Sequence, residues 1–163
     1  MSMIFSLTTE RKKDVEVILK RYPTKRSALL PVLWLVQEQE GYVPDGAVAY
    51  VAELLELKDV EVWGVVTFYT MFQRKPIGKH HVRVCTNMCC RLRGADMVLE
   101  HLKKKLGVDA GQTTPDGKFH LSTVECLGSC GTAPMMQIDN DYYEDLTERK
   151  IDDILRAPLK TSV

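Results

Sequence analysis

The sequence has neither an excess of one charge nor a long apolar run. Among its 163 residues, lysine and arginine number 22 together, as do aspartate and glutamate. A balanced chain carries no electrostatic footprint for nucleic acid or an anionic membrane surface, so we expect no nucleic-acid partner. The longest apolar stretch, Ala28 to Val36, is far too short to span a bilayer and contains Pro31. We therefore expect no direct membrane insertion.

Targeting and nucleotide-binding motifs are also missing. The segment Met1–Thr9 has no basic start, and its apolar run is too short for a secretory signal, so we expect a cytoplasmic protein with reduced thiols. Neither a Gly-x-Gly-x-x-Gly fingerprint nor a P-loop occurs, which argues against a dinucleotide or P-loop site on this chain. The dithiol redox motif Cys-x-x-Cys is absent as well. These absences leave the five cysteines as the most informative residues.

The hydrophobic pattern predicts helices for residues 1–78. Apolar residues recur at helical spacing in four segments, separated by proline- and glycine-containing turns. The expected helices start near Thr9, Ser27, just after Gly46, and near Asp59. The second of them is apolar nearly all round, so we expect it to be the central helix of a small bundle. The turn Pro76-Ile77-Gly78 marks the predicted end of this domain.

Residues 79–163 instead alternate between strand and helix patterns. The expected elements are a strand at His81–Cys85, a helix at Ala95–Leu106, a strand at Phe119–Val124, a hairpin around Asp139-Asn140-Asp141, and a helix capped by Thr147. This β-α-β-β-α order is that of a thioredoxin-like core. The predicted fold class is therefore α+β, with an N-terminal helical bundle (1–78) followed by a thioredoxin-like α/β domain (79–163).

Four cysteines stand in two short clusters that suit a metal centre. Four residues separate Cys85 from Cys90, and three separate Cys126 from Cys130. Each pair follows a predicted strand, at the sheet edge where ligands of α/β folds gather. Soft thiolates bind zinc or an iron–sulfur cluster. Zinc sites usually have tighter spacing, so these wider loops favour a [2Fe–2S] cluster with one pair on each iron. Zinc, a disulfide and plain thiols remain alternatives.

Glycines flank both pairs of cysteines and allow the backbone to turn toward sulfur. They are Gly94, Gly128 and Gly131. Amides that donate hydrogen bonds to thiolate sulfur stabilise a negatively charged cluster and help to set its potential. We therefore expect N–H···S bonds around both loops.

Cys89 and two histidines are predicted to have structural roles. Side chains of sequence neighbours usually point apart, so Cys89 is not expected to share an iron with Cys90, and we predict a small buried apolar residue there. His80 and His81 precede the first pair, but tandem histidines at the start of a strand are usually surface residues. We therefore do not expect a histidine-ligated Rieske centre.

Longer segments around these residues carry a family resemblance. They are Leu30–Leu33, Gly41–Pro44, Glu61–Tyr69, Val84–Cys90 with Gly94-Ala95, and Val124–Pro134. From about Ser27 to Leu155, the sequence resembles the thioredoxin-like [2Fe–2S] subunit of the NADH-dehydrogenase module of respiratory complex I, which is the E-subunit family of NADH-quinone oxidoreductase. The match includes both cysteine spacings.

The resemblance implies that Cys85, Cys90, Cys126 and Cys130 ligate one [2Fe–2S] cluster. It implies an electron-transfer subunit of NADH:quinone oxidoreductase, without a complete active site of its own. A larger partner subunit is expected to bind FMN and NADH and to carry a [4Fe–4S] cluster, within a complex that keeps this subunit peripheral to the inner membrane. The alternatives are the equivalent diaphorase subunit of an NAD-linked hydrogenase or formate dehydrogenase, or a zinc-stabilised interaction subunit.

Overall fold

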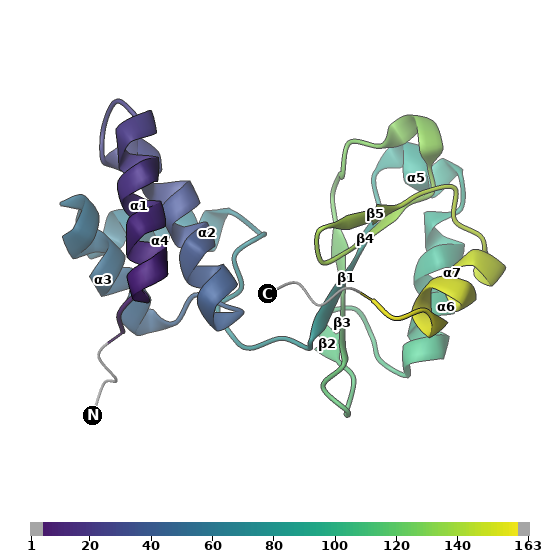
Figure 1. Ribbon diagram of the computed structural model, residues 1–163. Helices are drawn as coiled ribbons and strands as arrows, with labels where there is room; N and C mark the ends of the chain where they lie inside the picture. Colours follow the sequence, from purple (N-terminus) through teal and green to yellow (C-terminus); the bar gives the residue numbers. More distant parts are fainter. Residues whose placement is uncertain (1–4, 160–163) are drawn as a thin grey trace. The chain divides into compact units, whose positions relative to one another are not determined.

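The computed structural model describes residues 5–159, which divide into two compact units between Pro76 and Ile77 (Figure 1). We call residues 5–76 the helical unit and residues 77–159 the sheet unit. The first four residues of the Met1–Thr9 segment, and the last four of the predicted second domain, lie outside this range. Within residues 5–159, none of the helices combines the length and the apolar character needed to cross a membrane.

The helical unit has the four helices that the periodicity predicts. They are α1 (Thr9–Arg21), α2 (Leu29–Glu40), α3 (Asp45–Leu55) and α4 (Asp59–Phe68), with a short 3-10 helix, η1 (Arg26–Ala28), before α2. Thr8 caps α1 by accepting a hydrogen bond from the amide of Arg11. Gly41 ends α2 in the left-handed conformation. The strongly apolar α2 contacts each of the other three helices, which explains why its side chains are apolar on several faces.

Two helix starts differ from the predicted ones by a few residues. The α-helix α2 begins at Leu29 rather than Ser27, because the preceding residues form η1. Pro31 consequently lies in the first turn, where its missing amide hydrogen has no intrahelical partner. Helix α3 begins at Asp45, inside the predicted turn, where the aspartate carboxylate stabilises the positive end of the helix.

The sheet unit is a five-stranded sheet with the strand order β2-β3-β1-β4-β5. Its elements are β1 (His80–Cys85), α5 (Met88–Leu92), α6 (Ala95–Leu106), β2 (Gln112–Thr113), β3 (Phe119–Val124), the 3-10 helix η2 (Cys130–Thr132), β4 (Met136–Ile138), β5 (Asp141–Tyr143) and α7 (Glu148–Arg156). Strands β1 and β3 are parallel, and the other neighbouring pairs are antiparallel. The mixed α and β composition and the thioredoxin-like order of elements agree with the prediction. The short elements α5 and β2 are additions to it.

The register of the central strands brings both cysteine loops to one sheet edge. Val82 on β1 pairs with Leu121 on β3, and both side chains are fully buried under α6. The same register pairs Cys85 with Val124, the last residues of the two strands. Because parallel strands end at the same edge, the loops that follow them begin side by side.

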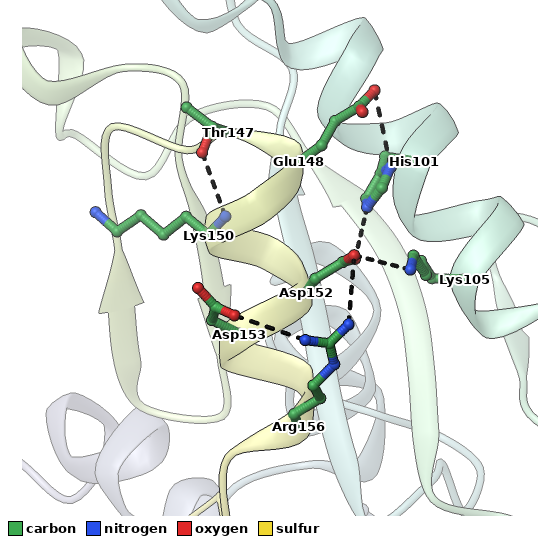
Figure 2. A network of polar contacts seen from close by, with 8 residues as sticks. All are labelled: His101, Lys105, Thr147, Glu148, Lys150, Asp152, Asp153 and Arg156. Atoms are coloured by element: carbon green, nitrogen blue, oxygen red, sulfur yellow. Dashed lines mark hydrogen bonds and ion pairs between the residues drawn. The ribbon is translucent and has the colours of Figure 1, made fainter.

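A polar network joins α6 and α7, which lie next to each other against the sheet (Figure 1). Figure 2 shows Asp152 of α7 between His101 and Lys105 of α6, with 2.8 Å from a carboxylate oxygen to each of the two nitrogens. Hydrogen bonds from Lys105 and His101 lower the pKa of the Asp152 carboxyl below its usual value. This network attaches α7, and the segment leading into it, to the body of the sheet unit.

Candidate metal centre

The first pair of cysteines is buried at the end of β1. Cys85 is the last residue of β1 and is 2% exposed, and Cys90 lies on α5 and is 1% exposed. The amide of Thr86 donates to the carbonyl of Val124 at 3.0 Å, so the first loop leaves the sheet attached to the end of β3. Burial therefore holds both sulfurs of this pair in place.

The second pair is exposed and lies on the loop that follows β3. Cys126 comes two residues after Val124, and Cys130 begins η2; both are exposed. The loop rejoins the sheet through the peptide between Ala133 and Pro134, which is cis. The two pairs thus differ in environment, with one inside the fold and one at its surface.

The thiols of the two loops affect one another, mainly through Cys89 and Cys130. The pKa of the Cys90 thiol is raised to about 11, mainly by burial. A hydrogen bond with Cys85 and the charges of Cys85 and Cys130 raise it further, by smaller amounts. The pKa of Cys130 is raised by a hydrogen bond with Cys89 and by its charge, then by burial and by Cys126. Cys130 of the second loop therefore lies near Cys89 and Cys90 of the first, and the convergence of all four predicted ligands stays a prediction.

The donor set fits a [2Fe–2S] cluster by its chemistry. Four thiols are the soft ligands that iron–sulfur clusters take, and each iron of the rhomb needs only two of them. Across residues 5–159, no three Cys, His, Asp or Glu side chains gather closely enough to hold one metal ion. Because each iron of a [2Fe–2S] rhomb needs only one pair of thiolates, this finding leaves the predicted cluster possible.

Backbone amides turn toward a sulfur of each loop, as predicted. The Gly128 amide donates to the Cys126 sulfur at 3.4 Å. An amide hydrogen bond from Met135 lowers the pKa of Cys90, against the larger effects that raise it. The amide of Gly94 itself donates to the carbonyl of Arg91 at 3.1 Å, and whether its turn directs another amide to sulfur stays a prediction. The expectation for Gly131 stays a prediction.

The prediction for Cys89 was wrong, because its side chain is exposed. Residues Met88–Leu92 form the helix α5, and consecutive residues of a helix point about 100° apart. When Cys90 faces the interior, Cys89 must therefore face outward, on the side where Cys130 lies. The sequence predicted that the two thiols diverge, but without α5 it did not indicate which environment each one enters.

The prediction that His80 is a surface residue was also wrong. His80 is 3% exposed, and its Nδ1 lies 2.7 Å from a carboxylate oxygen of Asp139. The alternation of β1 places it on the buried face, and Asp139 supplies the partner that a buried polar ring needs. The Nε2 of His81 lies 2.7 Å from the hydroxyl of Ser122. Both rings thus have hydrogen-bond partners of their own. They also lie four and five residues before Cys85, about 13–16 Å away along the strand.

Sequence reasoning missed a group of polar residues that surrounds the second loop. The Glu144 carboxylate accepts hydrogen bonds from the hydroxyls of Ser129 and Thr132, on either side of Cys130. The Tyr142 hydroxyl donates to the carbonyl of Leu127 at 2.9 Å. No motif marks these residues, since the contacts join positions 12 to 15 residues apart in the sequence.

Comparison with known proteins gives the chain a family. The profile of the thioredoxin-like [2Fe–2S] ferredoxins matches residues 15–158. The E subunit of NADH-quinone oxidoreductase from Rickettsia bellii is 47% identical over 154 residues, which cover 93% of this chain and 92% of that protein. The protein of the same name from Rickettsia conorii is 50% identical over 154 residues, with the same coverage.

A solved structure supports the fold independently. It is the crystal structure of an NAD⁺-reducing [NiFe]-hydrogenase in the H₂-reduced state, with a TM-score of 0.69 and 21% sequence identity. The match covers 80% of this chain but only 22% of the hydrogenase chain, so this protein corresponds to about a fifth of that polypeptide. With a matching family profile and relatives of nearly equal length, the chain belongs to the thioredoxin-like [2Fe–2S] ferredoxin family and, within it, to the E subunits of NADH-quinone oxidoreductase.

Proposed function

We propose that the chain is an electron-transfer subunit of NADH:quinone oxidoreductase, with one [2Fe–2S] cluster held by Cys85, Cys90, Cys126 and Cys130. The observation that supports this proposal is that both cysteine loops start at one sheet edge, where Cys130 of the second loop lies near Cys89 and Cys90 of the first. When bound, the cluster supplies a site that takes up and releases one electron. The chain's own contribution is to hold the sulfurs and to set their surroundings.

The two pairs of cysteines are expected to divide that contribution. Cys85 and Cys90 are buried and exclude water from their half of the site, whereas Cys126 and Cys130 face the surface, where an electron can enter or leave. Thiolate ligation with this much negative charge favours a low reduction potential, about −400 mV as in plant-type ferredoxins. The amides of Gly128 and Met135 point at sulfur and stabilise the added negative charge on reduction.

The proposed partner is a larger subunit that binds FMN and NADH and carries a [4Fe–4S] cluster. The relatives are named as subunits of an oxidoreductase, which requires further chains for substrate binding. On this chain, Met88 is 73% exposed and Leu92 82% exposed on α5, next to the cysteines. Exposed apolar side chains beside an electron-transfer site suit a protein partner that covers them. The assembled complex is expected to keep this subunit in the cytoplasm, peripheral to the inner membrane.

The two compact units support a related proposal on domain organisation. We infer that residues 1–78 are a helical bundle domain and residues 79–163 a thioredoxin-like domain that carries the cluster. Each unit has a hydrophobic core of its own, which is what independent domains require. Expression of residues 79–163 alone tests this, with a cooperative unfolding transition as the expected result.

Metal and sulfide analysis of the full chain tests the proposed function. Protein purified without oxygen should contain two irons and two inorganic sulfides per chain, be reddish, and give a rhombic spin-half EPR signal after reduction with dithionite. A colourless protein with stoichiometric zinc would instead identify a zinc-stabilised interaction subunit. Copurification from the native cells tests the parent complex. A flavoprotein together with quinone-reductase subunits is expected, and a hydrogenase or formate dehydrogenase would contradict that assignment.

A further inference from the structure

Polar contacts, rather than burial, hold the exposed cysteine loop. The Glu144 carboxylate accepts from the Ser129 hydroxyl and, at 2.7 Å, from the Thr132 hydroxyl. The two hydroxyl oxygens also lie 2.8 Å from each other, so Ser129, Thr132 and Glu144 form a triangle of hydrogen bonds. Ser129 directly precedes Cys130, and Thr132 follows it by two residues. The triangle therefore fixes the backbone on both sides of one proposed ligand.

The same segment contacts the loop at further points. We call residues 142–146 the clamp segment. The Tyr142 hydroxyl donates to the Leu127 carbonyl, and the amides of Asp145 and Leu146 donate to the carbonyls of residues 132 and 134 at 2.7 and 3.0 Å. These contacts run from one residue after Cys126 to the end of the loop. The clamp segment thus follows the second cysteine loop along most of its length.

The clamp segment is itself anchored to α7. The Lys150 ammonium donates to the backbone carbonyl of Glu144 at 2.6 Å, and its charge also faces the Glu144 carboxylate. Thr147 caps α7 by accepting from the amide of Lys150. Helix α7 in turn is joined to α6 through Asp152, as Figure 2 shows. A continuous set of contacts therefore connects the loop of Cys130 with the core of the sheet unit.

We propose that Glu144 is a positioning residue that holds Cys130 in the geometry needed for cluster binding. This inference rests on the proposed function, since it assigns Cys130 to the cluster. The first pair needs no such device, because packing fixes Cys85 and Cys90. The exposed pair has little packing, so charge-assisted hydrogen bonds from the Ser129 and Thr132 hydroxyls to the Glu144 carboxylate take its place. Hydrogen bonds from Ser129 and Thr132 also lower the pKa of Glu144, so the carboxylate is charged at neutral pH.

The carboxylate is also expected to affect the potential of the cluster. A negative charge beside the loop disfavours the reduced form, which carries one more negative charge. Replacement by Gln keeps an acceptor oxygen for the two hydroxyls and removes only the charge. Replacement by Ala removes both. The two variants therefore separate the positioning effect from the electrostatic effect.

The test compares Glu144→Ala and Glu144→Gln with a matched control, Asp153→Ala. Asp153 is a carboxylate of α7 that pairs with Arg156 at 3.8 Å (Figure 2), and within residues 5–159 no hydrogen bond or ion pair joins its side chain to the loop. With chelator present, Glu144→Ala should lose the cluster about 10- to 100-fold faster than wild type. Glu144→Gln should lose it more slowly than Glu144→Ala, though faster than wild type because its hydrogen bonds are neutral, and should have a raised potential. Asp153→Ala should match wild type in both measurements.

A second measurement uses the protein without its cluster. Amide hydrogen exchange of residues 127–132 should be faster in the Glu144→Ala apoprotein than in wild-type apoprotein, while exchange of β1 and β3 is unchanged. The double variant Ser129→Ala/Thr132→Val should reproduce the faster cluster loss, and adding Glu144→Ala to it should have little further effect. This variant also keeps the test decisive if Glu144→Ala does not fold.

The outcomes distinguish this inference from the proposed function. If wild-type protein binds no [2Fe–2S] cluster, the proposed function fails, and apoprotein hydrogen exchange still decides whether Glu144 holds the loop. If wild type binds the cluster, but Glu144→Ala and Asp153→Ala release it at equal rates, the positioning role is wrong while the function stands. The positioning role is also contradicted if the effects of Glu144→Ala and of Ser129→Ala/Thr132→Val on the rate of cluster loss are additive.

Discussion

The amide of Gly128 donates a hydrogen bond to the sulfur of Cys126, with 3.4 Å between nitrogen and sulfur. Gly128 has a φ of +83°, a conformation that residues with side chains rarely adopt. The left-handed turn is what directs the amide of Gly128 back toward a sulfur two residues earlier. One glycine therefore shapes the loop and supplies a donor to a proposed cluster ligand.

Gly128→Ala is expected to cost about 1 kcal/mol of folding free energy, because a Cβ disfavours the left-handed conformation. If the loop relaxes, the N–H···S bond weakens and the potential of the bound cluster falls, since the reduced form loses a donor. Denaturant unfolding and a spectroscopic redox titration measure the two effects. Gly131→Ala is the matched control, because an added Cβ meets nothing within 4 Å at either site. Of the two glycines, Gly128 alone has a left-handed φ. Equal effects at the two positions contradict this account.

The adjacent thiols of α5 provide a test of ligand choice. Cys90→Ser should abolish the cluster or perturb its EPR signal strongly, because Cys90 is buried and faces Cys85. Cys89→Ser should leave the cluster assembled, because Cys89 points away from the buried pair formed by Cys85 and Cys90. Iron and sulfide content, with EPR of the reduced proteins, measure both. An intact signal in the first variant and a lost one in the second would reverse the assignment of the first ligand loop.

The sequence was sufficient to predict the elements that have long periodic patterns. The helices α1 to α4, α6 and α7 carry apolar residues at helical spacing, and β1 and β3 alternate between buried and more exposed residues. Two strands that end in cysteine loops also placed the predicted ligands at one edge, since parallel strands end together. Local physics was enough here, because each signal extends over six or more residues.

The remaining features depend on contacts between distant residues. Helix α5 has five residues and β2 has two, which is too short for a period to be visible. Burial of His80 depends on Asp139, 59 positions later, which gives the ring a partner that β1 cannot supply. The role of Glu144 likewise appears only when the hairpin β4–β5 brings the clamp segment to the cysteine loop. No short sequence motif encodes such pairs.

The stability of the sheet unit should fall in mild acid because of His81. Burial lowers the pKa of His81 from 6.5 to about 3, with smaller effects from the charges of Arg83 and His120. The unfolded chain therefore binds a proton as the pH falls below about 6.5, whereas the folded chain stays neutral there until about pH 3. Because the unfolded state binds more protons in this window, the free energy of unfolding decreases as the pH decreases.

His81→Gln is expected to flatten that dependence by about one proton between pH 6.5 and 3. The glutamine keeps a polar group near Ser122, the partner of the histidine ring at 2.7 Å, but it does not titrate. Denaturant unfolding at a series of pH values gives the slope for wild type and variant. Identical slopes in the two proteins would show that the pKa of His81 in the folded state is close to its ordinary value of 6.5.

The contacts of Asp152 should stabilise α7 at neutral pH and stop doing so in acid. Hydrogen bonds from Lys105 and His101 lower the pKa of this carboxyl, so its contribution is present above the unfolded value of 3.8. That contribution is lost as the pH falls through the lower folded value. Asp152→Ala should therefore lower the melting temperature more at pH 7 than at an acidic pH below 3.8. Thermal unfolding at the two pH values measures this difference.

Asp153→Ala is the matched control for Asp152→Ala, because Asp153 lies on the same helix and its described partner is Arg156 at 3.8 Å, whereas Asp152 joins α7 to α6. The control should change the melting temperature little at either pH.

High salt should reduce the effect of Asp152→Ala, since the partner Lys105 is exposed and its attraction is screened. Because α7 also anchors Glu144 through Lys150, the same variant should speed amide exchange in residues 127–132, by less than Glu144→Ala does. If exchange there is unchanged while α7 loosens, the clamp segment holds the cysteine loop independently of α7.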